Sequence, residues 1–354
     1  MSSSPNVLVT GGAGFIGCAL AERWADRADR WVAFDNLHPQ VHAGRRRPEA
    51  LAQRAELVIG DVTDPGEWDR LLEGFRPDVV IHLAAETGTA QSLSEATRHG
   101  MVNVVGTTAM LDAFGRAGWT PGHVVLASSR AVYGEGQWRR SDGSLFSPGQ
   151  RSHAQLAAGE WDFADATPLP SRADRTPPAP TSVYGATKLA QEHLLMAWAG
   201  AHDVITTVFR LQNVYGPGQS LTNSYTGIVS LFSQLARRGE SIPLYEDGAI
   251  TRDFVLIDDV ADAIASVLDR ADAPAGPLDI GTGVATTISD LARSIAEFHG
   301  APAPHLTGKF RDGDVRHAAC EIAPTEEALG WAPRFDLTAG VAALQEWIDR
   351  VDPR

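Results

Sequence analysis

The sequence predicts an α/β fold: a doubly wound parallel sheet of the Rossmann type, followed by a smaller α/β part. Two observations predict it. Short apolar runs alternate with longer amphipathic stretches along the first half of the chain, and a glycine-rich turn joins the first run to the first expected helix. The runs are apolar throughout, as in strands buried on both faces, so helices must cover both sides of the sheet.

Six strands are expected along this part of the chain. They are Asn6–Val9, Trp31–Phe34, Ala55–Ile59, Val79–His82, His123–Ala127 and Ile205–Phe209. Between residues 137 and 181 the pattern breaks into Ser, Pro, Arg and Asp, which predicts a surface insertion with one short helix around His153–Glu160.

The pattern of apolar and polar residues changes again beyond Gly216. Helices are expected near Gly227–Arg238, Asp258–Arg270 and Ile288–Phe298, with a short strand at Ile242–Leu244. We therefore expect one domain over residues 1–212, including the insertion, and a smaller one over 213–354, with some chain crossing between them.

Composition excludes several classes of function. The chain has 354 residues, 44% of them hydrophobic, and 30 Lys and Arg against 44 Asp and Glu give a net charge of −14. A globular protein with this charge is a poor partner for nucleic acids or anionic membranes. The two cysteines, Cys18 and Cys320, and the eleven scattered histidines show no metal-ligand spacing. No signal peptide or membrane-spanning run is evident, so we expect a cytoplasmic protein without a metal.

The glycine turn predicts a dinucleotide site. In TGGAGFIG, Gly11 permits a tight turn, Gly14 lets the backbone approach a pyrophosphate, and Gly17 lets the helix pack on the strand. Asp35 ends the second strand, where a carboxylate accepts hydrogen bonds from an adenosine ribose and disfavours a 2′-phosphate. The expected cofactor is therefore NAD, held by Gly11, Gly14, Phe15, Ile16, Gly17, Asp35 and Asn36. The alternative is a turn needed only for packing.

The third strand ends in Gly60-Asp61-Val62, where Asp61 and Val62 are candidates for contact with the adenine edge. Asp61 by itself is as typical of a helix cap. Asp64, which precedes Pro65, is the better candidate for the N-cap of the next helix.

A tyrosine, a lysine and a serine suggest acid–base chemistry. Tyr184 and Lys188 are four residues apart on an expected helix, so they share a face. A neighbouring ammonium and a nicotinamide cation both favour the phenolate, which can then take a proton from a sugar hydroxyl. Ser129 follows the fifth strand, where its hydroxyl can bond the reacting oxygen. Each feature alone also fits an ordinary surface helix or strand end.

The ordered series of motifs resembles the extended short-chain dehydrogenase/reductase family of nucleotide-sugar epimerases, dehydratases and reductases. The motifs are TGGAGFIG, GDVTD, IHLAA, NVVGT, SSRAVYG, YGATK, NVYGPG, RDFVLIDDV, IGTG and RDGDVRH. They span nearly the whole chain.

This resemblance implies roles for single residues. Tyr184 would be the base, Lys188 its pKa partner and a ribose ligand, and Ser129 the hydrogen-bonding hydroxyl. Leu83, Ala84 and Ala85 would lie close to the cofactor, and Asn103 would support the site from a helix unless it is an ordinary polar helix residue. The nucleotide diphosphate would be held by Asn213, Arg252, Arg311 and Arg316. His82 is expected to be a structural histidine, and Glu86 and Thr87 would either face the sugar or cap a loop.

Departures from the family pattern narrow the reaction. Its dehydratases carry an Asp-Glu pair directly after the hydroxyl residue, where this chain has Arg130 and Ala131. The resemblance therefore implies a 4-epimerase, with an NAD(P)H-dependent 4-ketoreductase as the alternative and a non-catalytic dinucleotide sensor as a remote one. HLAAETGTAQS, SSRAVYGEG and YTGIVSLFSQ are most similar to the dTDP-L-rhamnose branch, ahead of the UDP-galactose type.

The resemblance also implies a homodimer formed by the helix after Asn103 and the helix carrying Tyr184. Met101, Val105, Met110, Leu111 and Phe114 are apolar at helical spacing, which suits either such an interface or an ordinary core face.

Overall fold

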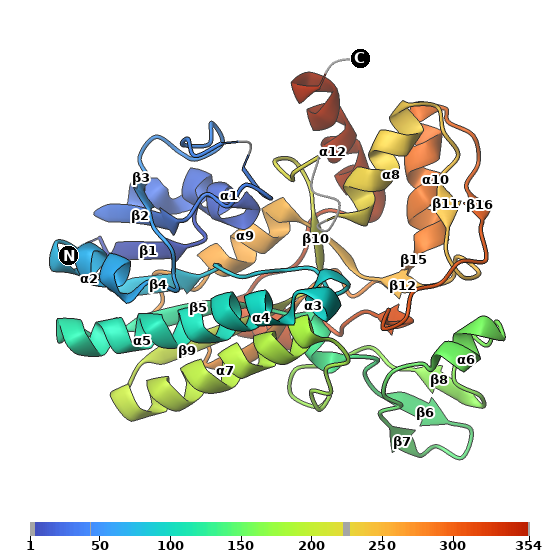
Figure 1. Cartoon of the computed structure of the whole chain (residues 1–354), viewed down its shortest axis with the longest axis horizontal. Coiled ribbons are helices and arrows are strands. Elements are labelled where there is room, and N and C mark those ends of the chain that lie inside the picture. Colours follow the sequence, from blue (N-terminus) through green and yellow to red (C-terminus); the bar gives the residue numbers. More distant parts are fainter. Residues whose placement is uncertain (1–3, 43, 222–226, 353–354) are drawn as a thin grey trace.

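A computed structural model describes residues 4–42, 44–221 and 227–352 of the chain. Its centre is a seven-stranded sheet of order β14-β9-β5-β4-β1-β2-β3, in which every neighbouring pair is parallel. The strands are β1 (Asn6–Thr10), β2 (Arg30–Asp35), β3 (Glu56–Ile59), β4 (Val79–His82), β5 (His123–Ser129), β9 (Ile205–Leu211) and β14 (Gly276–Ile280). The predicted doubly wound α/β sheet is confirmed (Figure 1).

Successive residues of each inner strand face opposite sides of the sheet. Val7 and Val9 of β1 belong to the core beneath α1 (Phe15–Trp24) and α9 (Ile257–Ala265), whereas Leu8 belongs to the other core. That second core packs against α2 (Pro65–Glu73), α5 (Gly106–Ala117) and α7 (Val183–His202). The apolar runs are therefore buried on both faces, except in the edge strand β3, where Glu56 and Ile59 are exposed.

The start of helix α2 follows from capping. Asp64 accepts hydrogen bonds from the backbone N–H groups of Gly66 and Glu67, with Pro65 as the first residue of α2. Between α4 (Ala96–His99) and α5 the chain forms a π-helix, η2 (Gly100–Val105). Short helices complete this region: η1 (Ala25–Arg27), α3 (Gln91–Ser94) and η3 (Arg130–Tyr133).

The part after β9 has its own core. It is built from α8 (Ile228–Arg237), α10 (Ile288–His299) and α12 (Leu337–Val351) around short strands, and Figure 1 shows these helices gathered beyond one end of the sheet. The remaining elements are β10 (Asn213–Tyr215), β11 (Pro243–Leu244), β12 (Thr251–Arg252), β13 (Phe254–Leu256), β15 (Thr286–Thr287), β16 (His305–Leu306), β17 (His317–Ala318) and α11 (Ala323–Leu329).

Helix α9 and strand β14 return from this C-terminal stretch to the main sheet, so the chain crosses between the two parts. The helix expected over Asp258–Arg270 is shorter than predicted, ending at Ala265. Residues 222–226, which include the start of YTGIVSLFSQ, lie outside the described part of the chain.

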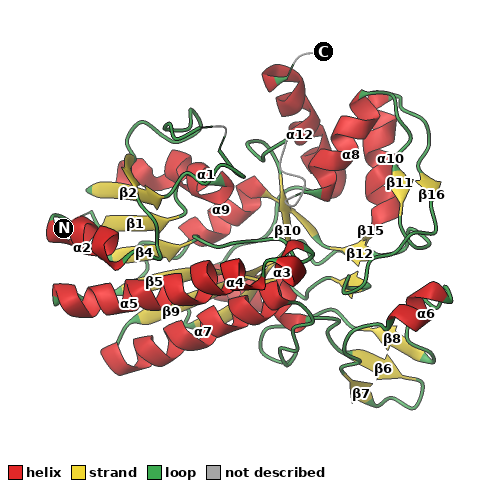
Figure 2. Cartoon of the chain, in the orientation of Figure 1, coloured by secondary structure: helices red, strands yellow, loops and turns green. Residues whose placement is uncertain are grey.

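The insertion has more structure than the sequence suggested. Besides α6 (His153–Ala157), it holds an antiparallel sheet of β6 (Trp138–Arg140), β7 (Leu145–Phe146) and β8 (Ala166–Pro168), which was not predicted. Figure 2 shows this small sheet and helix set apart from the main sheet. Trp138 is fully buried, and its ring meets those of Phe163 in the insertion and His317 in β17, so an aromatic cluster joins the insertion to the C-terminal part.

None of the described helices has the length and apolar character needed to cross a membrane. The described residues also contain no cluster of His, Cys, Asp and Glu suited to a metal ion.

Candidate active site

A cavity of about 1370 Å³ opens at the carboxyl ends of the central strands. This is the edge at which open parallel sheets bind ligands, next to the point where strand order reverses between β1 and β4. The cavity exceeds the usual size of a small-molecule pocket, roughly 300–1,000 Å³, so it has room for a dinucleotide and a second ligand. Most of the predicted site residues line it: Gly11, Gly14, Phe15, Ile16, Gly17, Asp35, Asn36, Val62, Leu83, Ala84, Ala85, Glu86, Thr87, Ser129, Tyr184, Lys188 and Asn213.

The glycine turn forms one wall. Gly11 has φ +65°, and a Cβ there would lie 2.8 Å from the backbone nitrogen of Ala84. A Cβ on Gly17 would lie 2.5 Å from the carbonyl oxygen of Gly12, which explains how closely α1 packs on the turn. Gly14 is the N-cap of α1 and carries no side chain to occupy the free N–H groups of the first turn. These N–H groups and the helix dipole suit an anionic phosphate.

Asp35 lies at the end of β2 and holds the turn. Its carboxylate accepts hydrogen bonds from the backbone N–H groups of Ala13 (3.1 Å) and Leu37 (2.8 Å), and the residue is 9% exposed. Asn36 donates to Asp61 at 3.0 Å. Asp61 itself does not line the cavity; it also accepts from the backbone and hydroxyl of Thr63. Asp61 thus orients Asn36 instead of facing a ligand.

Asn103 supports the site without lining it. Its amide accepts from the backbone N–H of Glu86 (2.7 Å) and donates to the carbonyl oxygen of Glu86 (3.0 Å) and the hydroxyl of Thr187 (2.9 Å). The segment after β4 is thereby tied to α7. Glu86 is ion-paired with Arg98 at 2.8 Å, so its carboxylate faces the cavity with a partner already in place.

Ser129, Tyr184 and Lys188 come together in the cavity, as the sequence predicted. Ser129 is the last residue of β5, and α7 begins just before Tyr184 because the Ser182 side chain caps it by accepting from Gly185 N–H at 3.0 Å. Burial raises the pKa of Tyr184, while a hydrogen bond with Ser129 and the positive charge of Arg130 lower it, with a net rise.

Lys188 lies deeper and is held by Gln191, a residue that the sequence pattern did not single out. Lys188 Nζ donates to Oε1 of Gln191 at 2.6 Å, and Gln191 Nε2 donates to Thr107 Oγ1 at 2.8 Å. Gln191 Nε2 also lies 3.2 Å from His82 Nε2. Burial lowers the pKa of Lys188 to about 7, although the charge of Glu192 raises it. The spacing of Lys188 and Gln191, three residues on one helix face, was the available signal.

His82 is a structural residue, as expected. It is fully buried, with Nδ1 2.7 Å from the Thr10 hydroxyl, and burial together with the charge of Lys188 lowers its pKa to about 3. A neutral His82 can accept from Gln191, which leaves the Gln191 oxygen free to accept from Lys188.

The four residues expected to hold a diphosphate lie in surroundings that differ from one residue to the next. Asn213 lines the cavity and accepts from Arg130 Nε at 2.9 Å. Arg252 is buried just outside it and is paired with Asp314 at 2.7 Å. Arg311 lies over the ring of Tyr245, with its guanidinium carbon 4.9 Å from the centroid.

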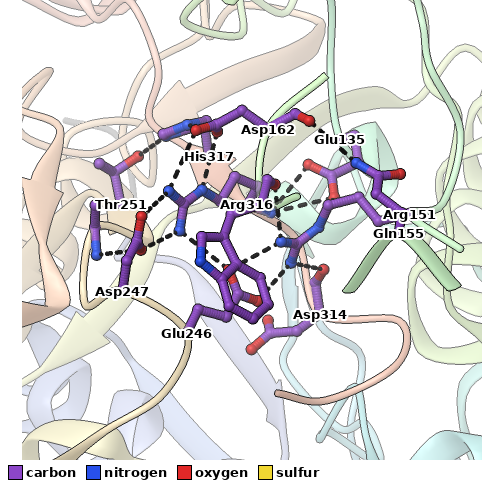
Figure 3. Close-up of polar contacts among 12 residues, drawn as sticks. Glu135, Arg151, Gln155, Asp162, Glu246, Asp247, Thr251, Asp314, Arg316 and His317 are labelled. Carbon is purple, nitrogen blue, oxygen red and sulfur yellow. Dashed lines mark hydrogen bonds and ion pairs between the residues drawn. The ribbon is translucent and has the colours of Figure 1, made fainter. Parts of the chain in front are cut away.

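Arg316 does not fit its expected role as a phosphate ligand. The residue is 2% exposed, and its guanidinium donates to Asp162 (3.0 Å), Glu246 (3.0 Å) and Asp247 (2.7 Å). Figure 3 shows these carboxylates around it. With its hydrogen bonds taken by carboxylates, Arg316 is a structural residue, and the expectation is corrected.

The same cluster joins the insertion to the C-terminal part. Arg151, from the insertion, donates to both oxygens of Glu246 (2.9 Å each) and to the carbonyl oxygen of Asp314 (2.9 Å) (Figure 3). Glu135 accepts from the Arg316 backbone N–H at 3.0 Å and lies 3.4 Å from Arg151 Nε. Burial raises the pKa of Glu135 to about 7.

Comparison with known proteins agrees with this geometry. The family model described as NAD dependent epimerase/dehydratase family matches residues 7–281. The chain is 62% identical to dTDP-L-rhamnose 4-epimerase of Burkholderia thailandensis over 97% of this chain and 94% of that protein.

Solved structures are similar over nearly the full length. UDP-glucose 4-epimerase of Thermotoga maritima with UDP-glucose has a TM-score of 0.80 at 27% identity, covering 98% of this chain and 99% of that one. UDP-glucose 4-epimerase of Thermus thermophilus in complex with NAD has a TM-score of 0.76 at 27% identity, covering 97% and 98%. From its fold, its site and these similarities, the chain belongs to the NAD-dependent epimerase/dehydratase family.

Proposed function

We propose that this protein is an NAD-dependent nucleotide-sugar 4-epimerase and that its substrate is dTDP-L-rhamnose or the C4 epimer of that sugar nucleotide. The observation that carries the reaction type is the meeting of Ser129, Tyr184 and Lys188 in the cavity beside the glycine turn. The substrate is proposed from the 62% identity to a dTDP-L-rhamnose 4-epimerase, a similarity that extends over 97% of the chain.

The residues of the cavity fit NAD. The α1 N-terminus offers free N–H groups and no side chain at its cap, and Gly11 leaves no Cβ in the way. Asp35, Leu83, Ala84 and Ala85 line the same cavity. The Asp35 carboxylate would repel a 2′-phosphate, which favours NAD over NADP. When bound, NAD supplies the capacity to take a hydride from a carbinol carbon and to return it.

The chain's own residues supply the acid and the base. Tyr184, as phenolate, takes the proton of the sugar C4 hydroxyl, and as phenol it returns a proton to that oxygen. The Ser129 hydroxyl donates a hydrogen bond to the same oxygen, which favours its passage to a carbonyl. Lys188, held by Gln191 at 2.6 Å, would bind the ribose hydroxyls of the cofactor.

Substrate contacts follow from the remaining cavity residues. Asn213 borders the cavity and would contact the diphosphate. Arg252 and Arg311, which are engaged with Asp314 and Tyr245, stay candidates for the same role. Glu86 and Thr87 line the cavity where the sugar must reach Tyr184. These contacts hold the nucleotide while the sugar turns over, so that binding energy remote from C4 retains the intermediate.

The test is incubation of purified protein with dTDP-L-rhamnose, without added cofactor, and identification of the sugar by NMR. We expect conversion to the C4 epimer, and the same final mixture when the reaction starts from that epimer. Tyr184→Phe should reduce turnover at least about 100-fold, the usual contribution of a general base. UDP-glucose, run in parallel, tests the nucleotide and the sugar.

A different outcome would identify the alternative. If no sugar nucleotide is epimerised but a 4-keto sugar nucleotide consumes NADH or NADPH, the protein is a 4-ketoreductase. Binding of NAD with no turnover of either kind would point to a non-catalytic sensor.

We also propose a homodimer. Of the five apolar residues considered above, Met110, Leu111 and Phe114 are buried in the core, whereas Met101 and Val105 are 46% and 40% exposed on η2. Met196 on the adjacent helix α7 is 45% exposed. Sedimentation should give a dimer, and Met101→Glu should shift it toward monomer.

The cytoplasmic location and the assignment of residues 1–212 to NAD and 213–354 to the nucleotide sugar also stay predictions.

A further inference from the structure

Arg130 lies at the wall of the active-site cavity and forms no ion pair with any residue that the structure describes. It directly follows Ser129, its residue is half-buried, and it lines the same cavity as Tyr184. Its Nε donates to Asn213 Oδ1 at 2.9 Å, which fixes the direction of the guanidinium. Within the described chain, its two terminal nitrogens have no hydrogen-bond partner and are not buried, so they are open to the cavity.

The four fully buried arginines of the described chain are neutralised by direct contact with carboxylates. Arg151 and Arg316 contact Glu246, Arg210 contacts Glu192 at 2.7 Å, and Arg252 contacts Asp314 at 2.7 Å. Arg130, in contrast, presents its charge to the cavity without a carboxylate partner, so it is placed to interact with an anion that binds or forms there.

The two carboxylates whose charges act on Arg130 already have partners. Asp314 and Glu135 both attract Arg130 from a distance. Asp314, however, is held by Arg252, and Glu135 is held by the Arg316 backbone and Arg151. Burial and the charge of Arg252 lower the pKa of Arg130 to about 9, which still leaves it protonated at neutral pH.

The backbone segment that carries Arg130 packs against the first turn of the helix that carries Tyr184. A Cβ on Gly185 would lie 2.4 Å from the carbonyl oxygen of Ala131, so the segments carrying Arg130 and Tyr184 touch at a point where only a glycine fits. Ser129 Oγ accepts from the Ala131 N–H at 3.2 Å, which ties the serine into the same turn. The charges of Arg130 and Tyr184 act on each other.

We propose that Arg130 is a further residue of the catalytic site, and that its guanidinium stabilises the deprotonated phenol of Tyr184 from the substrate side of the cavity. This inference rests on the proposed function, in which Tyr184 is the base. Lys188 is held by Gln191 at 2.6 Å and lines the same cavity, and Arg130 adds a second positive charge, which lowers the pKa of Tyr184.

The other groups around Tyr184 do not replace this charge. Ser129 is neutral and contributes a hydrogen bond. His99, from α4, meets the Tyr184 ring edge-on with centroids 6.4 Å apart, and its two nitrogens face the carbonyl oxygens of Glu95 (3.0 Å) and Thr87 (3.3 Å). Arg98 pairs with both Glu86 and Glu95 at 2.8 Å, so this cluster has no net positive charge to offer the phenol.

The first test measures Tyr184 without turnover. The ultraviolet absorbance of phenolate is followed with pH in the protein and in its Tyr184→Phe counterpart, and the difference titrates Tyr184 alone. The same pair is then made in Arg130→Gln. A neighbouring opposite charge typically changes a pKa by about 1–3, so we expect Tyr184 to titrate about one pH unit or more higher in Arg130→Gln. Arg130→Lys, which keeps the charge, should restore most of the difference.

The second test is the pH profile of epimerisation. In Arg130→Gln the acidic limb of kcat should move to higher pH, and kcat at neutral pH should fall about tenfold for each pH unit by which that limb moves. KM should change less than kcat. Arg116→Gln is the matched control, because Arg116 pairs with Asp69 at the surface and does not line the cavity. If Arg130→Gln does not fold, Arg130→Met provides the same comparison.

Two results would overturn the proposal. One is an unchanged Tyr184 titration in Arg130→Gln. The other is a raised KM with an unshifted pH profile, which would make Arg130 only a substrate anchor. Because the absorbance titration needs no substrate, it tests Arg130 even if the proposed epimerase activity is absent.

Discussion

Removing Arg151 tests whether the buried ion cluster secures the insertion to the rest of the protein. The Arg151 side chain is 1% exposed, and its terminal nitrogens make four hydrogen bonds: two to Glu246, one to the carbonyl oxygen of Asp314 and one to that of Trp161. Arg151→Met keeps much of the aliphatic volume and removes all four. It leaves Glu246 and Glu135, both buried, short of a positive partner.

The expected loss can be placed within a range. Breaking a buried ion pair by removing one partner costs about 3–5 kcal/mol. Arg316 still contacts Glu246 at 3.0 Å after the change, so the lower end applies. A loss of about 3 kcal/mol is roughly two powers of ten in the folding equilibrium. Urea unfolding at neutral pH should show a lower midpoint with an unchanged slope, which would mark a loss of stability without a change in the surface exposed.

Controls distinguish this cluster from ordinary surface charge. Arg116→Met removes an exposed pair with Asp69 and should cost less than about 1 kcal/mol. Adding Glu135→Gln to Arg151→Met should recover part of the loss, because Glu135 loses its ion pair with Arg151 and is neutral as glutamine. A loss below about 1 kcal/mol in Arg151→Met, or no recovery in the double variant, would refute the reasoning.

Three further changes have defined outcomes. Gln191→Leu removes the hydrogen-bond acceptor of Lys188 and should lower the pKa of that lysine, so the alkaline loss of kcat should begin at lower pH. Gln191→Glu should move this loss to higher pH. Identical pH profiles of kcat in the two variants and the unchanged protein would contradict this. Glu135 has a folded pKa of about 7 against 4.5 unfolded, so it destabilises the fold increasingly as pH rises from 4.5 to about 7. As the pH rises between those values, the free energy of unfolding of Glu135→Gln, measured in urea, should increase relative to that of the unchanged protein by up to about 3 kcal/mol. A difference that stays constant with pH would exclude the effect. Gly11→Ala, strained at φ +65° and facing Ala84, should weaken NAD binding measured by calorimetry, and unchanged affinity would show that the turn adapts.

Local patterns carried most of the prediction. The glycine turn, the acid after the second strand and the Tyr184–Lys188 spacing are contained within a few residues, so the sequence indicated both the elements and their role. The inner strands were evident for the same reason, because a run buried on both faces differs from any surface segment.

What the sequence did not disclose depends on partners far along the chain. Arg151 and Glu246 are 95 residues apart, and nothing near either one signals the other. Arg316 lies in the motif RDGDVRH, for which the resemblance implied ligand binding, but three carboxylates accept the hydrogen bonds of its guanidinium. Met101 and Met110 both fit an apolar helical face, and only packing separates the exposed from the buried one. The three short strands of the insertion lack the length that makes a strand recognisable.

The place of β14 in the sheet has a consequence for synthesis of the chain. Strand β9 is almost wholly buried, and its outer edge is covered by β14, which follows it by more than sixty residues, from Leu211 to Gly276. During translation the first six strands can assemble while this edge still exposes unpaired backbone groups and apolar side chains. An uncovered strand edge is a template for pairing with another chain. The nucleotide-binding sheet is therefore protected from aggregation only after the C-terminal part has been synthesised.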